Sequence, residues 1–307
     1  MAAGLPLATQ AQTGKPLRII VPYGTGTGAD IISRLVGSSL TERIKDPVII
    51  DNRSGNGSII GVNALKNAAP DGSTIGVLVS ADAAQPSLVK DLPVDLRKGF
   101  VPLTILYSGP LAMTVNVNLP VRTLAEFVGY ARANPGKVFY RSLGAGTTTH
   151  LAAEMLKQVA NIQMTNVPFK GSNEIHTAVA SGEVQMSFDN YISPKPLVDA
   201  GKLRVIASIS KARSGTLPNV PTVAESYPGV ELGFWTGFAA PAGTSRENAE
   251  RVGGALRAVL ALPEVRRKIA ETGSEPGGGS AAEFGALIEG DVEKFGRIIR
   301  GAGIKPE

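Results

Sequence analysis

A glycine-rich turn near the start of the chain has residues that can bind an anion. Residues 23–30 read YGTGTGAD, after the apolar run LRIIVP and before the amphipathic stretch DIISRLVGSSLTERI. This order predicts a strand, a turn and the first turn of a helix. Free backbone N–H groups and the positive end of a helix dipole meet at such a turn, so the segment predicts an anion site.

A dinucleotide is one candidate for that anion. Gly24, Gly26 and Ala29 fit the fingerprint G-x-G-x-x-A. Asp51 ends the next expected strand, PVIID, where the acid that binds a ribose hydroxyl would stand. Such a site would make the protein an NAD(P)-dependent dehydrogenase, and this function is kept as an alternative.

Other features of the turn favour a smaller anion. Pro22 stands just before the turn, where the fingerprint normally continues an unbroken strand. Thr25 and Thr27 alternate with the glycines and add hydroxyl donors, whereas Asp30 would repel a pyrophosphate. We interpret Asp30 as an acid that complements the helix dipole and Asp51 as a turn-forming residue.

The same arrangement recurs in the second half of the chain. KVFYRS predicts a strand, LGAGTTTH a glycine-rich turn and LAAEMLKQVAN a helix. Two such turns, one in each half, favour a ligand held between two helix N-termini. The residues that would contribute here are Gly144, Gly146, Thr147, Thr148, Thr149 and, at the mouth of the helix, His150.

Strands and helices alternate through both halves, which predicts an α/β protein whose mostly parallel sheets are covered on both faces. Ligands of open α/β sheets gather at the carboxyl ends of strands, where both glycine turns begin. Thr123 and Glu126 predict a capping box at the start of the helix LAEFVGYARAN.

Composition limits the possible functions. The 307 residues are 43% hydrophobic and 19% charged, which fits a soluble globular protein of about two domains. The net charge of +5 is spread along a chain with only 5% aromatic residues, so no nucleic-acid partner is expected. No run of 18 apolar residues occurs, so no membrane insertion is expected.

Nothing in the sequence argues for catalysis. The chain has no cysteine, which excludes thiolate nucleophiles and disulfides. It has no G-x-S-x-G motif, and His176 is expected to be a surface or packing residue. We therefore expect a protein that is not an enzyme and needs no metal or cofactor.

Residues 1–14, MAAGLPLATQAQTG, are expected to be disordered and to lie outside the fold. Leu7–Gln12 contains small residues spaced as at the end of a signal peptide. We interpret the segment as the remainder of an export signal; a disordered cytosolic leader is the alternative.

Many short segments occur in a recognisable order. The opening KPLRIIVPYGTGTGADIISRLVGSSL is followed by PVIIDNRSGNGSIIG, APDGSTIGV, GTTTHLAAEMLK, VPFKGS, GEVQMSFDN, LPNVPTVAES and APAGT. In this order they resemble the Bug-type, or tripartite tricarboxylate transporter (TctC-like), solute-binding receptors. The first turn of that family usually reads V-P-F-P-P-G-G-x-x-D. The resemblance covers Lys15 to about Arg300.

The resemblance implies a fold of the periplasmic-binding-protein type II kind, with two α/β lobes, a ligand cleft between them and two hinge crossings. It implies an exported, periplasmic, monomeric receptor whose lobes close on a small carboxylate. Di- and tricarboxylates, acidic amino acids and aromatic acids are typical of the family. The receptor would deliver its ligand to a membrane permease; a ligand-loaded sensor without a permease is a further alternative.

The resemblance also implies lobe boundaries. Lobe one is expected to comprise residues 15–112 and 237–307, and lobe two residues 117–232. The hinges are expected near 113–116 and 233–236.

In the family, two turns hold the ligand carboxylate between them as a pincer. These turns map onto Tyr23–Ala29 and Gly144–His150, and the family's third loop and F-D-N motif map onto 80–82 and 188–190.

Arg141 stands where the family usually has a small residue. Its side chain is expected either to contact a second polar group of the ligand or to pair with a neighbouring acid. Trp235 is expected either to line the cleft or to pack in the core. The full set of expected ligand-binding residues is Tyr23, Gly24, Thr25, Gly26, Thr27, Gly28, Ala29, Ser80, Ala81, Asp82, Arg141, Gly146, Thr147, Thr148, His150, Phe169, Lys170, Asp189 and Trp235.

Overall fold

The computed structural model describes residues 14–55, 58–90, 92–142, 147–168, 172–301 and 303. The expected leader therefore lies outside the described residues, apart from its last residue. Gly144, Gly146, Phe169 and Lys170 lie outside them as well.

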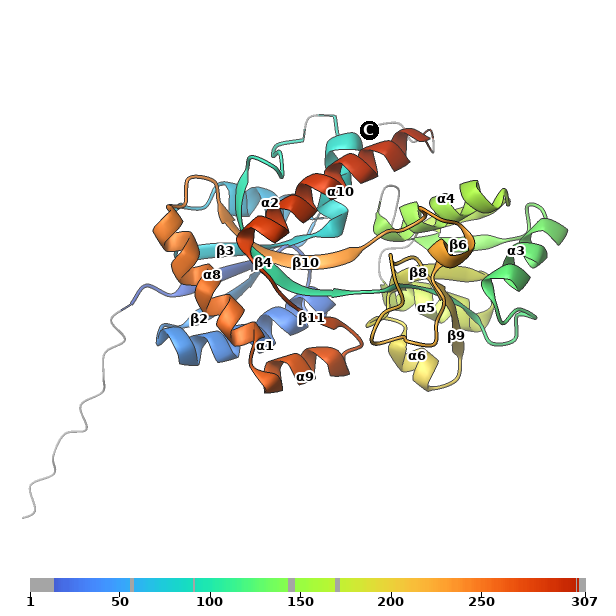
Figure 1. The fold of residues 1–307 in the computed structure, drawn as a ribbon, viewed down its shortest axis with the longest axis horizontal. Helices are drawn as coiled ribbons and strands as arrows, with labels where there is room; N and C mark the ends of the chain where they lie inside the picture. The colour runs from blue at the N-terminus through green and yellow to red at the C-terminus, as the bar shows by residue number, and fades with distance from the viewer. Residues whose placement is uncertain are drawn as a thin grey trace, which may run out of the picture.

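Two β-sheets organise the described chain, one in each half of the molecule (Figure 1). The first has the order β11-β4-β10-β3-β1-β2, and the second has the order β7-β6-β8-β5-β9. The strands of the first sheet are β1 (Leu17–Val21), β2 (Val48–Asn52), β3 (Thr74–Val79), β4 (Phe100–Gly109), β10 (Phe234–Pro241) and β11 (Glu275–Gly278). Those of the second are β5 (Leu111–Asn116), β6 (Phe139–Ser142), β7 (Thr165–Pro168), β8 (Met186–Asn190) and β9 (Leu203–Ser208).

Helices surround both sheets. In chain order they are α1 (Gly28–Ile44), α2 (Ile59–Lys66), the 3₁₀ helix η1 (Ser80–Ser87), α3 (Leu124–Ala133), α4 (Thr148–Ala160), α5 (Ser172–Ser181), α6 (Lys195–Asp199), α7 (Val223–Ser226), α8 (Arg246–Leu260), α9 (Pro263–Glu271) and α10 (Ala281–Gly301). This is an α/β fold built on two sheets, as the sequence predicts.

Each face of the first sheet has its own apolar layer. Ile19 and Val21 of β1 point to the face where Ile32 of α1 and residues of α8 and α9 pack. Ile20 points to the opposite face, where α2, η1 and α10 pack. The alternation follows from the two-residue period of a strand, and it explains why LRIIV reads as an almost continuous apolar run. The second layer continues through Trp235 into the core of the second sheet.

The strand directions correct one expectation. The sheets are mixed rather than mostly parallel, because β10 runs antiparallel to both β3 and β4, and β5 runs antiparallel to β8 and β9. Parallel pairing holds for β1 with β2 and β3, and for β6 with β7 and β8. The long strands β4 and β10 carry the chain out to the second sheet and back, so they must run in opposite directions.

The chain changes sheet at two places. It leaves the first sheet at Gly109 and enters the second at Leu111, a little before the expected hinge at 113–116. Pro110 has no N–H to continue a ladder, which accounts for the break at this point. The chain re-enters the first sheet at Phe234, within the second expected hinge, 233–236. The division into two lobes at the expected boundaries remains a proposal.

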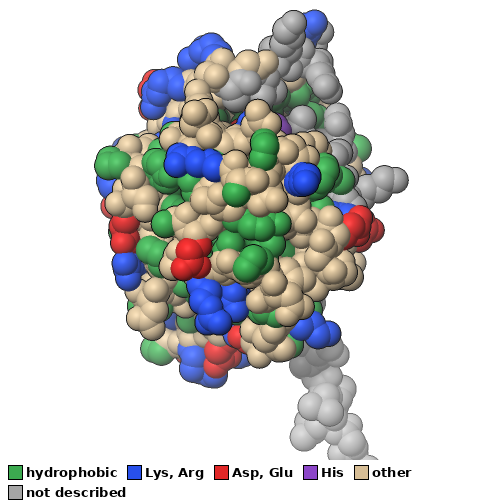
Figure 2. Space-filling view, turned by 90° about the vertical axis from the view of Figure 1, so that its right-hand side faces the viewer, with side chains coloured by type: hydrophobic (Ala, Val, Ile, Leu, Met, Phe, Trp, Pro, Cys, Tyr) green, Lys and Arg blue, Asp and Glu red, His purple; other side chains and the backbone are tan. Residues whose placement is uncertain are grey.

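The surface is mixed in character. On the face that Figure 2 shows, basic side chains are scattered among acidic and apolar ones. Among the described residues, no helix has the length and apolar character needed to cross a bilayer.

Candidate functional site

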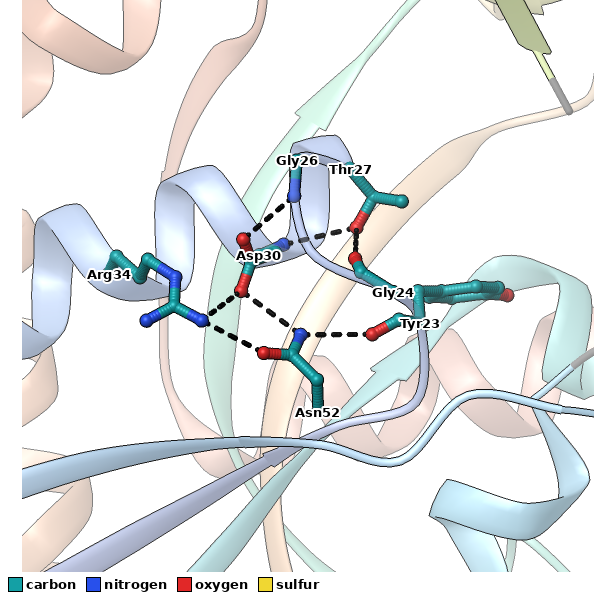
Figure 3. A network of polar contacts seen from close by, with 7 residues as sticks. All are labelled: Tyr23, Gly24, Gly26, Thr27, Asp30, Arg34 and Asn52. Atoms are coloured by element: carbon teal, nitrogen blue, oxygen red, sulfur yellow. Dashed lines mark hydrogen bonds and ion pairs between the residues drawn. The ribbon is translucent and has the colours of Figure 1, made fainter.

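The first glycine turn is held by its own aspartate (Figure 3). Asp30 is buried, and its Oδ2 accepts a hydrogen bond from Gly26 N at 2.9 Å. Its Oδ1 accepts from the Asn52 amide at 3.0 Å and lies 2.8 Å from the Arg34 guanidinium. Burial alone would raise the pKa of Asp30, but these donors outweigh it and lower the pKa. The acid therefore does more than complement the helix dipole, because it fixes the path of the turn.

Asn52 ties the turn to the neighbouring strand. Its amide also donates to Tyr23 O at 2.9 Å. Asp51, the acid that a ribose would need, lies in β2 with Oδ1 only 3.0 Å from Arg53 Nε. It is a strand residue engaged in an ion pair and not the turn-forming residue that the sequence predicts. Asn52 is the residue of this strand that organises the turn.

The first turn of α1 presents backbone donors at its N-terminus. Thr27 is the N-cap: its hydroxyl donates to Gly24 O at 3.0 Å and accepts from Asp30 N at 3.4 Å. Gly28 and Ala29 follow it, and N–H groups at these positions have no acceptor within a helix. Thr25 and Thr27 are exposed, so the turn is accessible from outside. The groups that can bind an anion here are the backbone N–H donors and the Thr25 hydroxyl.

The second glycine turn also leads to a threonine-capped helix. The Thr147 hydroxyl accepts from His150 N at 3.4 Å and lies 2.9 Å from the Thr149 hydroxyl. Thr148, Thr149 and His150 form the buried first turn of α4. Burial lowers the pKa of His150, and its ring stacks on Tyr140 with centroids 6.3 Å apart. His150 is therefore neutral at pH 7, and the helix N-terminus is the source of positive potential here.

The third loop has a structural acid. Asp82 is fully buried; its Oδ2 accepts from Val79 N at 2.8 Å, and Oδ1 accepts from the Ser58 hydroxyl and from Gln85 Nε2. Desolvation raises the pKa of Asp82 to about 6, although the donors partly offset it. Because both carboxylate oxygens are engaged by the protein, Asp82 shapes the loop that carries Ser80 and Ala81.

Tyr23 connects the third loop to the first turn. Burial of its phenol raises the pKa well above the usual value, and the nearby charge of Asp82 raises it further. The Ser58 hydroxyl opposes these effects, and Tyr107 adds to them. Tyr23, Ser58, Asp82 and Tyr107 therefore form one polar group beside the first turn.

Asp189, from the F-D-N motif, is held by a buried histidine. Its Oδ2 lies 3.0 Å from His176 Nε2, and its Oδ1 accepts from Asn190 N at 2.7 Å. His176 is 1% exposed, so it is a packing residue with a defined partner. Since an ionised carboxylate only accepts hydrogen bonds, Nε2 of His176 carries the proton.

The two halves of the molecule meet at Gly28. A Cβ atom on Gly28 would lie 3.1 Å from the Tyr107 hydroxyl and 3.5 Å from Cδ1 of Ile192. Tyr107 belongs to β4, whereas Ile192 follows the last residue of β8, Asn190. The N-terminus of α1 therefore lies against the carboxyl end of β8. Strand β6, which precedes the second glycine turn, runs parallel to β8.

Arg141 is paired inside the second half. It is 1% exposed, and its guanidinium forms an ion pair with Glu183, which is 65% exposed. Of the two alternatives from the sequence, the structure shows the pairing with a neighbouring acid. A contact between Arg141 and a ligand remains a proposal.

Trp235 lies in the core. It is 2% exposed, and its ring packs edge-on against Phe284 at a centroid distance of 5.2 Å. Its Nε1 donates to Asp291 Oδ2 at 2.6 Å. The side chain faces α10, whereas Thr236 beside it is on the opposite face of the strand.

The structure places Tyr23 and Asp82 together beside the first turn, and it adds residues that the sequence did not predict. Tyr107, Ser58 and His176 were not among the expected site residues. Each is an isolated polar residue in an apolar or loop segment, so no motif identifies it. A hollow lined by Lys15, Asp46, Asp71 and Arg251 lies at the opposite, amino end of β1. Ligands of α/β sheets do not usually bind at that end.

Comparison with known proteins is consistent with this geometry. The family model described as "Tripartite tricarboxylate transporter family receptor" matches residues 32–304. The UPF0065 protein of the tcbD–tcbE intergenic region of Pseudomonas sp. (strain P51) is 30% identical, and the match covers 97% of this chain and 92% of that protein.

Solved structures show the same fold. R. palustris Rpa4515 with adipate has a TM-score of 0.87 and 31% identity, covering 95% of this chain and 98% of that one. The periplasmic binding protein BugD has a TM-score of 0.84 and 25% identity, covering 95% and 99%. The chain belongs to the tripartite tricarboxylate transporter receptor family, the Bug or TctC-like solute-binding proteins.

Proposed function

We propose that the protein is an exported solute-binding receptor that captures a small carboxylate between its two halves. One observation carries the proposal. The N-terminus of α1 lies against the carboxyl end of β8, beside the strand that leads to the N-terminus of α4. Two helix N-termini at one junction suit an anion, since each directs backbone N–H groups and the positive end of a helix dipole toward it.

The ligand carboxylate would be held by both first turns. On the α1 side the donors are Gly28 N, Ala29 N and the Thr25 hydroxyl. On the α4 side the donors are the backbone N–H and the hydroxyl of Thr148, together with groups of Gly146 and Thr147 in the turn before it. Bridging water is a suitable partner here, because it binds nearly as well as a direct donor.

The chemical class of the ligand is supported by the site and by the family. The first turn argues against a dinucleotide, since Asp30 accepts the hydrogen bond from Gly26 N–H and Asp51 is ion-paired with Arg53. The related Rpa4515 is known with adipate, a dicarboxylate. A small mono- or dicarboxylate is therefore the proposed ligand, and an NAD(P)-dependent dehydrogenase is the function to be tested against it.

Membership of the family supports a role in transport. A tripartite tricarboxylate transporter receptor would work in the periplasm and deliver its ligand to permease subunits in the membrane. Only the closed state contacts the ligand from both sides, so the ligand would favour closure of the two halves. The permease would then bind the receptor in this closed state. A sensor that uses the same closure remains the alternative to transport.

A thermal-shift panel tests the proposed function. Purified protein is heated with acetate, propionate, succinate, adipate, citrate, glutamate, benzoate or NAD(H). A carboxylate present at about 100 times its Kd stabilises the folded state by about 2.7 kcal/mol and raises Tm. A shift with NAD(H) and with no carboxylate would overturn the proposal. Small-angle scattering of the responding sample should show a smaller radius of gyration with ligand.

Arg141 has its own test within this proposal. If it contacts a second carboxylate, Arg141→Ala should remove any preference for succinate over propionate. Equal loss for both acids, or for neither, would show that Arg141 does not contact a second ligand carboxylate.

A further inference from the structure

The hydroxyl of Tyr107 lies at the junction of the two halves. Tyr107 is 2% exposed, and its ring packs against Phe234 with centroids 5.8 Å apart. The ring position is fixed by this packing and by Gly28, whose missing Cβ leaves room for the hydroxyl at 3.1 Å. The phenol therefore ends beside the first turn of α1, where the ligand carboxylate is proposed to bind.

Thr236 lies next to Tyr107 on the adjacent strand. The two residues are cross-strand partners in the pairing of β4 with β10, so their side chains project from the same face of the sheet. Thr236 is fully buried, and its hydroxyl lies close enough to the Tyr107 phenol to act against the rise that burial causes in the pKa of that phenol. Each hydroxyl can both donate and accept, so the pair offers a ligand group one donor or one acceptor even while the two contact each other.

Asp189 lies at the carboxyl end of β8, the end that packs against Gly28 and thus lies beside the Tyr107 hydroxyl. Burial raises the pKa of Tyr107 to about 12, and the charge of Asp189 contributes to the rise. Tyr107 therefore keeps its proton at neutral pH and can donate. His176 Nε2, at 3.0 Å, fixes the orientation of the Asp189 carboxylate.

This combination selects for a particular ligand group. A ligand hydroxyl can donate to the Asp189 carboxylate and accept from Tyr107 or Thr236 at the same time. A second ligand carboxylate can accept from the two hydroxyls but is repelled by Asp189, and this repulsion is strong where solvent is excluded. An ammonium group satisfies Asp189 but has no lone pair for a donating hydroxyl.

We propose that Tyr107, Thr236 and Asp189 form a second subsite that binds a hydroxyl group on the ligand, so that the receptor prefers hydroxycarboxylates to their deoxy analogues. The inference rests on the proposed function, because it assumes that a carboxylate occupies the two helix N-termini. His176 acts as a positioning residue for Asp189.

Matched ligand pairs test the subsite by calorimetry. Propionate is compared with lactate, and succinate with malate, because each pair differs by one hydroxyl group. Wild type should bind at least one hydroxyacid about tenfold more tightly than its deoxy partner. Tyr107→Phe and Thr236→Val should each reduce that preference severalfold and change the affinity for the deoxy acid less than twofold. Tyr130→Phe, on α3, removes a phenol hydroxyl away from the junction and should leave the preference unchanged.

The outcomes separate this inference from the proposed function. Equal binding of both members of each pair, unaffected by Tyr107→Phe, would overturn the subsite and leave the carboxylate receptor standing. Tighter binding of aspartate than of malate would overturn it too, because Asp189 would then bind an ammonium group. Binding of none of these acids, nor of any in the thermal-shift panel, would overturn both. Melting curves of the variants check that each is folded.

Discussion

The carboxylate of Asp30 accepts a hydrogen bond from the backbone N–H of Gly26 at 2.9 Å, within its own glycine turn. Gly26 has a φ of 80°, a left-handed conformation that favours glycine. The Asp30 carboxylate thus binds one N–H of the turn, that of Gly26. The N–H groups of Gly28 and Ala29 remain at the N-terminus of α1. A preformed turn of this kind lowers the cost of ordering a loop when ligand binds.

Removing the Asp30 carboxylate should destabilise the protein. Asp30→Ala leaves Gly26 N without its acceptor and removes one of the two acceptors of the Asn52 amide, so the free energy of unfolding should fall by about 2–3 kcal/mol. Arg34→Ala is the matched control, because Arg34 is half-exposed and its ion pair should contribute less than about 1 kcal/mol. Urea denaturation of the three proteins measures both values. Equal losses for the two variants would contradict the central position of Asp30.

Asp82 should make stability depend on pH. Its folded pKa, about 6, is above its usual value of 3.8, so the folded state binds this proton more tightly than the unfolded state does. The stabilisation is complete below the unfolded pKa and is lost as pH rises through about 6.

Asp82→Asn should remove this pH dependence. Between pH 7 and pH 4 the unfolding free energy of wild type should increase relative to the variant by roughly 2–3 kcal/mol. Other titrating groups are shared by both proteins and cancel in the difference. A difference that stays constant across this range would show that the buried carboxyl keeps an ordinary pKa.

Trp235 should matter for stability and not for ligand affinity. Trp235→Phe removes the hydrogen bond from Nε1 to the buried Asp291 carboxylate and should lower the unfolding free energy by about 1–3 kcal/mol. Because the side chain packs against α10, the Kd of a bound carboxylate should change less than twofold. A large change in Kd with little loss of stability would place Trp235 in the cleft instead.

Local signals in the sequence predicted the parts of the site that depend on neighbouring residues. The fold class and family were confirmed, and the two threonine-capped helices lie where the glycine turns indicate. The predicted capping box is half formed: Thr123 accepts from Glu126 N at 3.2 Å, but Glu126 accepts from Arg122 N and not from Thr123 N. The carboxylate satisfies whichever free N–H lies closer, which propensity alone does not determine.

Long-range features were not predictable in this way. Asn52 holds the first turn from 22 positions beyond Asp30, and His176 holds Asp189 from another element. Tyr107 stands in the strand FVPLTILYSG, where it reads as one more apolar residue. The mixed strand directions depend on how β4 and β10 pair, and pairing between distant strands leaves no local signal.

The affinity of a carboxylate for wild type and for Thr148→Val, measured by isothermal titration, tests the central claim most directly. Thr148 begins α4, and its hydroxyl or a water bound to it is proposed to donate to the ligand carboxylate. Loss of that donor should weaken binding of every carboxylate that responds by about 1–3 kcal/mol. Thr123→Val, at the start of the distant α3, should keep the wild-type Kd. Wild-type affinity in Thr148→Val would contradict a carboxylate held between the two helix N-termini.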